Sequence, residues 1–210
     1  MNNNISNIPN AILMQEARES LKGNWGLPIT ATIICMLISG LMQFIPFLGW
    51  IALVAIQPQI GVGASIFYLN LSRKKEITLE QLFETFKNGN RFGNIIGTYL
   101  LMFLCVMLGF ICLIIPGIIL CFAFSQTFFI LSEDGNIGPV DTLKKSYNMM
   151  IGNKWKYFCL TCRFIGWTLL SIITLGIGFL WFYPYFWVST AKFYESIEVD
   201  NSNVALENKN

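Results

Sequence analysis

Three long stretches without a charged side chain constrain this chain more than any other feature. No Asp, Glu, Lys or Arg occurs in residues 23–72, 92–131 or 164–191. A charge at the centre of a bilayer costs roughly 2.5 to 3.5 kcal/mol even on insertion-based scales, so stretches of this length are typical of membrane segments. The composition agrees, because 54% of the residues are hydrophobic and only 12% are charged. We therefore expect an integral membrane protein.

Each charge-free stretch is too long for a single membrane helix, which needs about 20 residues. Each also has a Pro- or Gly-containing break near its middle: "FIPFLG" at 44–49, "IIPG" at 114–117 and "TLGIG" at 174–178. Proline and glycine in these positions end or bend helices. The sequence therefore predicts an all-α membrane protein with six transmembrane helices, arranged as three helical hairpins.

The charged residues lie before, between and after these hairpins, which predicts their orientation. Lys and Arg remain on the cytoplasmic side of a membrane, so we expect a multi-pass cell-membrane protein with both termini in the cytoplasm. Basic and aromatic side chains that flank the apolar stretches are predicted to anchor the protein at the membrane interface. These interfacial anchors are Trp25, Arg91, Phe92, Lys154, Trp155 and Lys156.

Related segments precede the three apolar stretches: "KGNW" at 22–25, "NGNRF" at 88–92 and "GNKWKYF" at 152–158. Before each of them stands a short stretch with the spacing of an amphipathic helix, and Gly23, Gly89 or Gly152 supplies a C-terminal stop signal. The apolar faces predicted for these helices are Leu13, Ala17 and Leu21; Leu79, Leu82, Phe83 and Phe86, capped by Thr78; and Val140, Leu143, Tyr147 and Met150.

The second helix of each predicted hairpin also closes on an aromatic pair, at 67–68, 128–129 and 193–194. Self-similarity at a nearly fixed period indicates a repeat. We predict a pseudo-threefold repeat, in which a short amphipathic interfacial helix precedes each hairpin, over residues of about 11–72, 76–132 and 139–196. Residues 11–196 would form a single polytopic membrane domain. The polar, Asn-rich ends at 1–10 and 197–210 are expected to be disordered tails.

Several of these motifs resemble those of a known protein family. They are "LFETFKNGNRF" at 82–92, "LIIPGII" at 113–119, "LKKSYNMMIGNKWKYFCL" at 143–160, "RFIGWTLLSIITLGIGFLWFYPY" at 163–185 and "AKFYE" at 191–195. The chain resembles, over residues of about 12–196, an uncharacterised family of bacterial integral-membrane proteins called domain of unknown function 975. The resemblance implies a polytopic membrane protein, and it supplies no reaction, ligand or partner.

Polar side chains inside the apolar stretches are the candidate ligand-binding residues. Gln57 and Gln59 flank Pro58 within a predicted helix, where their amides either satisfy the backbone that proline frees or line a polar site in a broken helix. Gln126 and Tyr185 would join that site from the other repeats. Arg163 lies about two turns inside its helix, where its guanidinium either extends to the headgroups or contacts an anion or lipid phosphate within the bundle.

The remaining residues give little support for catalysis. The "CLTC" motif at 159–162 has the spacing of a metal or redox site, but zinc needs four ligands and the chain has no His. We expect no catalytic residues, no metal and no cofactor. A net charge of +2 gives no reason to expect nucleic acid as a partner.

Two functions remain open after these exclusions. The first is a non-catalytic membrane protein that organises lipid, or binds a membrane protein partner or a second copy of itself, through its hairpins and interfacial helices. The alternative is a small transporter or channel for a solute or a lipid headgroup. Proton coupling is disfavoured, because no acid or His lies in the predicted spans to carry the proton.

Overall fold

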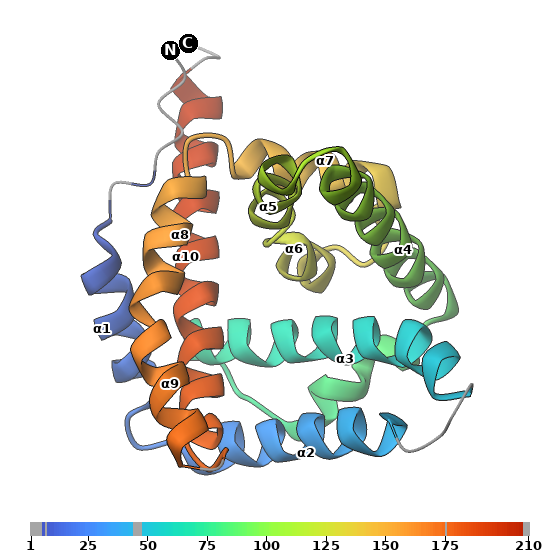
Figure 1. Cartoon of the computed structure of the whole chain (residues 1–210). Helices are drawn as coiled ribbons and strands as arrows, with labels where there is room; N and C mark the ends of the chain where they lie inside the picture. The colour runs from blue at the N-terminus through green and yellow to red at the C-terminus, as the bar shows by residue number, and fades with distance from the viewer. Residues whose placement is uncertain (1–5, 7, 44–47, 175, 208–210) are drawn as a thin grey trace.

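The computed structural model describes residues 6, 8–43, 48–174 and 176–207, and all regular structure within them is helical (Figure 1). The elements are α1 (Asn10–Leu21), α2 (Gly26–Gln43), α3 (Leu48–Ser72), the 3-10 helix η1 (Leu79–Phe86), α4 (Gly89–Cys112), α5 (Ile114–Ala123), α6 (Thr127–Glu133), α7 (Pro139–Met149), α8 (Lys154–Arg163), α9 (Ile165–Ile173) and α10 (Phe179–Glu207). The predicted all-α class is confirmed.

The helices cross one another rather than forming a parallel bundle. In Figure 1, α10 stands as a column with α8 and α9 beside it, while α2 and α3 run across its lower part. Helix α1 packs along α10, and α3 contacts α2, η1, α4, α6 and α10. Helix α3 is therefore the central element, and residues 58–60 and 62–69 along it are all buried.

Three helical segments are long and apolar enough to cross a membrane: Gly89–Cys112, Ile114–Glu133 and Lys154–Ile173. The number rises to four if Asn10–Leu21 and Gly26–Leu41, which meet at a bend of 99°, count as one broken span. The first of these segments is α4, and the second and third join α5 with α6 and α8 with α9. The described residues therefore include three or four candidate spans.

An aromatic cluster lies where α3, α6 and α10 meet. The Phe129 and Tyr194 rings stack with their centroids 5.5 Å apart, and the Trp187 ring stacks on Tyr68 at 5.8 Å. Trp187 also contacts Phe129 at 5.7 Å. Offset stacks and tilted pairs of this kind are favourable aromatic geometries. They join three segments that are distant in the sequence.

A charged cluster caps the same meeting point. Arg73, just past the end of α3, pairs with Glu133 at the end of α6 and with Glu195 and Glu198 on α10. Its Nε atom lies 3.1 Å from Glu195 Oε1. The Tyr194 hydroxyl donates a hydrogen bond to Glu133 Oε2 at 2.7 Å. One guanidinium thus links the ends of α3 and α6 to the middle of α10 through charge-assisted hydrogen bonds.

The apolar face predicted for the first interfacial helix is confirmed, because Leu13, Ala17 and Leu21 are all buried in α1. The face predicted for the third is wrong in part. Leu143 and Met150 are buried, but Val140 and Tyr147 are exposed, and Thr142, Ser146 and Met149 are buried instead. Helix α7 is therefore rotated about its axis relative to the prediction. In this orientation the Ser146 hydroxyl donates a hydrogen bond to the Ala123 carbonyl at 2.9 Å.

The second predicted interfacial helix is a 3-10 helix, which changes the face it buries. With three residues per turn, side chains at i, i+3 and i+6 share a face. Leu82 and Thr85 are accordingly buried, whereas Phe83 and Phe86 are 41% and 39% exposed. The predicted side-chain cap at Thr78 is also wrong, since its side chain makes no cap hydrogen bond.

Two predicted helix ends differ from the structure. The break assigned to 114–117 falls at Leu113, where φ is −166°, and residues 114–117 form the first turn of α5. Gly89 opens α4 rather than ending the preceding helix, with Asn88 as its cap. Gly23 and Gly152 do adopt positive φ values of 90° and 82° just beyond α1 and α7, as helix-stop glycines do. The "FIPFLG" break lies largely outside the described residues.

Both predicted tails carry structure where they are described. Helix α10 continues to Glu207, so residues 197–207 are helical, and Ile197 is fully buried. At the other end, the Ser6 backbone N–H donates to Asn153 Oδ1 at 2.9 Å, and Lys156 Nζ donates to the Ser6 carbonyl at 2.7 Å. These buried polar contacts hold Ser6 against the start of α8, which the Asn-rich composition does not reveal.

Candidate functional site

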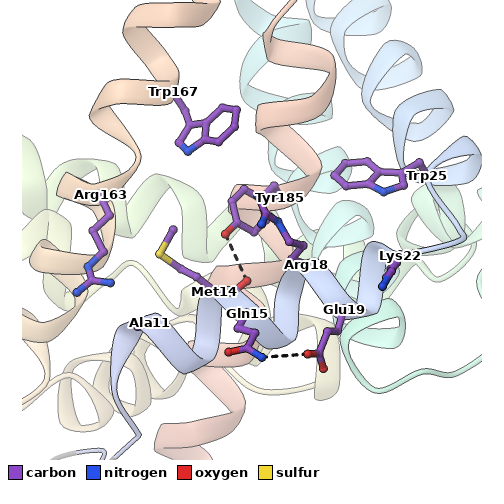
Figure 2. Close-up of a pocket in the computed structure, with 10 residues that line it drawn as sticks. All are labelled: Ala11, Met14, Gln15, Arg18, Glu19, Lys22, Trp25, Arg163, Trp167 and Tyr185. Carbon is purple, nitrogen blue, oxygen red and sulfur yellow. Dashed lines mark hydrogen bonds between the residues drawn. The ribbon is translucent and has the colours of Figure 1, made fainter.

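The candidate site is a groove between α1, the α8–α9 junction and α10, with a volume of about 920 Å³. It lies within the usual size of ligand sites, about 300 to 1,000 Å³. Figure 2 shows the ten residues that line it, which are Ala11, Met14, Gln15, Arg18, Glu19, Lys22, Trp25, Arg163, Trp167 and Tyr185.

One face of α1 supplies most of the polar side chains of this groove. Ala11, Gln15, Arg18 and Lys22 recur at spacings of four, three and four residues, which places them along one side of a helix. The opposite face holds the buried residues of α1. The amphipathic pattern therefore packs the helix and, at the same time, turns its basic residues towards the groove.

Tyr185 fixes the position of α1 against α10. Its hydroxyl donates a hydrogen bond to the Met14 carbonyl at 3.3 Å. In Figure 2 the Tyr185 ring lies between Arg163 on one side and Trp25 on the other. Because this bond joins α10 to α1, it fixes the position of the basic residues of α1 relative to the aromatic residues of α10.

The groove carries a positive charge. Arg18, Lys22 and Arg163 are exposed, and among the described residues none of them has a carboxylate partner in an ion pair. The single acid of the groove, Glu19, accepts a hydrogen bond from Gln15 Nε2 at 3.2 Å. Three cations and one acid leave an excess of positive charge, which suits an anionic ligand.

Aromatic side chains form the other wall and continue into a second cavity. Trp25, Trp167, Tyr185 and Arg18 also line an adjoining cavity of about 240 Å³, together with Trp181 and Phe182. Trp167 and Trp181 are 43% and 50% exposed. The site thus passes from a cationic part to an apolar part within one continuous set of residues.

Two of the five candidate ligand-binding residues from the sequence, Arg163 and Tyr185, come together in this groove. The three glutamines lie elsewhere and have different partners. Gln57 Oε1 accepts from Ser39 Oγ at 3.1 Å beside a cavity of about 220 Å³. Gln59 Nε2 donates to the Phe92 carbonyl at 3.0 Å, and Gln126 Nε2 donates to Ser125 Oγ at 3.0 Å.

The helix around Pro58 is continuous, since α3 runs through it from Leu48 to Ser72. The broken helix that would have lined a polar site at the glutamines is therefore not present. Gln59 instead joins neighbouring elements, because its backbone carbonyl also accepts from Thr85 Oγ1 of η1 at 3.2 Å.

The residues predicted as interfacial anchors have several different contacts. Trp25 lines the groove. Trp155 is 73% exposed, and Lys154 Nζ lies 4.6 Å from the centre of the Tyr147 ring. Two others bind within the fold: Arg91 Nη2 donates to the Ser132 carbonyl at 3.0 Å, and Lys156 donates to Ser6. Phe92 packs its ring 6.1 Å from that of Phe86.

Sequence reasoning missed Arg18, Lys22 and Trp167 as parts of a site. Arg18 and Lys22 look like the solvated face of any amphipathic helix, and Trp167 looks like one of many apolar residues in its stretch. A usable signal was available in the spacing from Arg163 to Trp167, because residues four apart share a helix face.

Comparison with known proteins finds one family model that matches part of the chain, and it supplies no function. Residues 104–201 match the family described as "Protein of unknown function (DUF975)". The resemblance drawn from the motifs is confirmed over this segment, which includes Arg163, Trp167 and Tyr185 but not α1. No curated protein and no solved structure matches the chain.

Proposed function

We propose that this chain, whose residues 104–201 match a family of unknown function, is a non-catalytic protein of the cell membrane that organises lipid around its hairpins and interfacial helices. The support for this proposal is physical. Three or four segments are long and apolar enough to span a bilayer, and the groove beside α1 is lined by both cationic and aromatic side chains.

The observation that carries the proposal is the exposed apolar surface of the candidate spans. In the apolar 18-residue segment of α4, only 17% of the residues are buried inside the fold. Exposed large apolar side chains lie on α4, α5 and α9, including Phe103, Leu104, Leu108, Ile111, Ile114, Ile115, Leu169, Leu170 and Ile173. Exposed apolar surface of this extent is stable against lipid and unfavourable against water.

We further propose the six-span, threefold arrangement with cytoplasmic termini. The element order supports it, because α1–α2–α3, η1–α4–α5/α6 and α7–α8/α9–α10 each place a short helix before two longer segments. The second residue of each aromatic pair, Tyr68, Phe129 and Tyr194, is also buried at 1% exposure or less. Burial of α3 by its neighbours suits a helix that is shielded from lipid.

Cysteine labelling in intact cells tests this topology. In a cysteine-free background, Ile115→Cys and Ile177→Cys should react with an impermeant maleimide, because both sites lie at outer turns and are 71% and 62% exposed. Lys75→Cys and Lys144→Cys, also exposed, should react only after permeabilisation. Protection of the first pair in expressed, folded protein would instead support hairpins that enter and leave on the cytoplasmic side.

The transporter or channel alternative receives less support than lipid organisation. It required Gln57, Gln59 and Gln126 to share a path, and their amides have separate partners. The groove that does contain Arg163 and Tyr185 opens along the outer side of α1 instead.

A further inference from the structure

We propose that the groove between α1, the α8–α9 junction and α10 is a binding site for one anionic phospholipid. The cationic part would hold the phosphate, and the adjoining aromatic cavity would hold the upper part of an acyl chain. This inference rests on the proposed membrane function and names the class of ligand.

The cationic residues have the chemistry that a lipid phosphate requires. A guanidinium presents several N–H donors in a plane and binds phosphate oxygens in pairs. Arg18 and Arg163 approach the groove from α1 and from the end of α8, and Lys22 stands at its far end (Figure 2). In Figure 2 Arg163 and Lys22 lie at opposite ends of the groove and Arg18 lies between them, so basic groups from different elements line the groove along its length.

The local charge favours an anionic lipid over a zwitterionic one. Glu19 is the only acid in the lining, and it already accepts a hydrogen bond from Gln15. A headgroup that carries a cationic amine or choline would meet three cations in the groove. The one carboxylate that could pair with it, Glu19, already accepts a hydrogen bond from Gln15. A headgroup whose net charge is negative has no such conflict.

The aromatic extension distinguishes a lipid from a soluble anion. Trp25, Trp167, Trp181 and Phe182 line the adjoining cavity of about 240 Å³. Trp rings favour the level of the headgroups, where one side is polar and the other apolar. Exposed apolar residues of α9, such as Leu169 and Leu170, continue from this cavity, so an acyl chain could leave the site directly into the bilayer.

Native mass spectrometry of the full chain in a neutral detergent tests the proposal. Phosphatidylglycerol and phosphatidylcholine with identical acyl chains are titrated separately, and the dissociation constant of the first lipid adduct is measured. We expect phosphatidylglycerol to bind at least ten-fold more tightly. Equal binding of the two lipids to the wild-type protein would overturn the proposal, whatever the variants do.

Charge-removing variants locate the site. Each basic group near an anionic lipid contributes about five-fold in affinity, so Arg18→Gln with Arg163→Gln should weaken phosphatidylglycerol binding about 30-fold. Lys87→Gln with Lys144→Gln is the matched control, because it removes the same charge from exposed positions outside the groove. Equal losses in the two double variants would indicate general attraction and contradict a site.

Glycerol phosphate separates a lipid site from a site for a free anion. This soluble headgroup lacks acyl chains, so it should compete with phosphatidylglycerol only at a concentration at least 100-fold higher, a difference of about 2.7 kcal/mol. Competition at equal concentration would assign the groove to a soluble phosphate and overturn the lipid proposal.

A second variant tests the acyl part of the site. Trp181→Ala should weaken phosphatidylglycerol binding several-fold while glycerol phosphate binding stays unchanged. Cysteine labelling of each variant reports membrane insertion separately. Normal insertion without lipid preference would reject this inference alone, whereas failure of the wild-type protein to insert would reject the proposed membrane function.

Discussion

Gly63 occupies one of the closest backbone contacts in the fold. A Cβ atom there would overlap the Leu82 carbonyl oxygen of η1, and backbone cannot move aside as a flexible side chain can. Gly40 in α2 differs in this respect, because a Cβ added to it would meet nothing within 4 Å. The sequence alone does not distinguish these two glycines. In the structure Gly63 lies against the backbone of η1, whereas Gly40 has free space around it.

Substituting these glycines gives a matched test of the α3–η1 contact. Gly63→Ala should destabilise the protein by about 1 to 3 kcal/mol, as overpacking does. Gly40→Ala should be neutral or stabilising by up to about 1 kcal/mol, since alanine favours a helix. Thermal unfolding in detergent, followed by circular dichroism, measures both. Equal stability of the two variants would show that η1 does not approach α3 so closely.

Two of the three carboxyl groups that face Arg73, those of Glu133 on α6 and Glu198 on α10, have different environments. Partial burial raises the pKa of Glu198 above its usual value, and the neighbouring Glu133 raises it further, while Arg73 and Lys145 oppose the shift. A carboxyl with a raised pKa binds its proton more tightly in the folded chain. Its contribution to stability is therefore full at acidic pH and is lost as the pH rises through the folded pKa.

Amide variants should separate these two groups. Glu198→Gln cannot ionise, so its stability relative to the wild-type protein should increase as the pH rises above the usual pKa of a glutamate and through the raised pKa of Glu198. Glu133→Gln loses a charged partner of both Arg73 and Tyr194 and should cost about 1 to 2 kcal/mol near neutral pH. Unfolding midpoints across this pH range provide the measurement, and parallel curves for Glu198→Gln and the wild-type protein would refute the assignment.

At the scale of elements, η1 shows how a change of helix type changes the buried face. An α-helical period predicts that Phe83 packs inside, whereas the 3-10 period buries Leu82 and Thr85. Gly63 explains the preference in part, because the close approach of η1 to α3 needs a narrow element. The hydrophobic pattern alone fits either period over eight residues.

Truncating one side chain from each face of η1 distinguishes the two periods. Leu82→Ala should cost about 2 to 5 kcal/mol, because it leaves a cavity at a fully buried site. Phe83→Ala should cost about 1 kcal/mol or less, since its ring is 41% exposed. Unfolding in detergent reports both values. A larger loss of stability in Phe83→Ala than in Leu82→Ala would indicate that this segment is an α-helix with Phe83 buried.

The elements that sequence predicted well are those whose signal is local. Charge-free stretches gave α4 and the α5–α6 segment, and apolar spacing gave the buried face of α1. The turn at Leu113 could not be located from the sequence. Helix breaks are recognised by Pro or Gly, and this turn is made by one extended leucine. Arg163 and Tyr185 stood out as polar groups in apolar stretches. Arg18 and Lys22 did not stand out, because the sequence of α1 does not reveal which helices pack beside it.

At the scale of the whole molecule, the charged cluster at Arg73 holds the ends of α3 and α6 against α10. Two of its three carboxylates come from the middle of α10. The same region supplies Tyr194, which completes the aromatic cluster with Phe129. The three segments therefore depend on one another, and the C-terminal helix closes the structure.

Two truncated chains test this dependence. A chain that ends after residue 192 lacks Tyr194, Glu195 and Glu198 and should be degraded or aggregate, because Arg73 and Phe129 lose their partners. A chain that ends after residue 200 keeps all of them and should reach nearly wild-type levels in the membrane. Quantitative immunoblotting of membrane fractions measures both, and normal levels of the shorter chain would show that the cluster is dispensable.

The ion pair between Arg73 and Glu195 also sets a schedule for biosynthesis. The two residues lie 122 positions apart, so at a translation rate of about 5 to 20 residues per second, roughly 6 to 24 seconds separate their addition to the chain. During that interval Glu133 is the one carboxylate of the cluster that is already available to Arg73. The arginine therefore gains its full set of partners only after Glu195 and Glu198 of the C-terminal helix have been made.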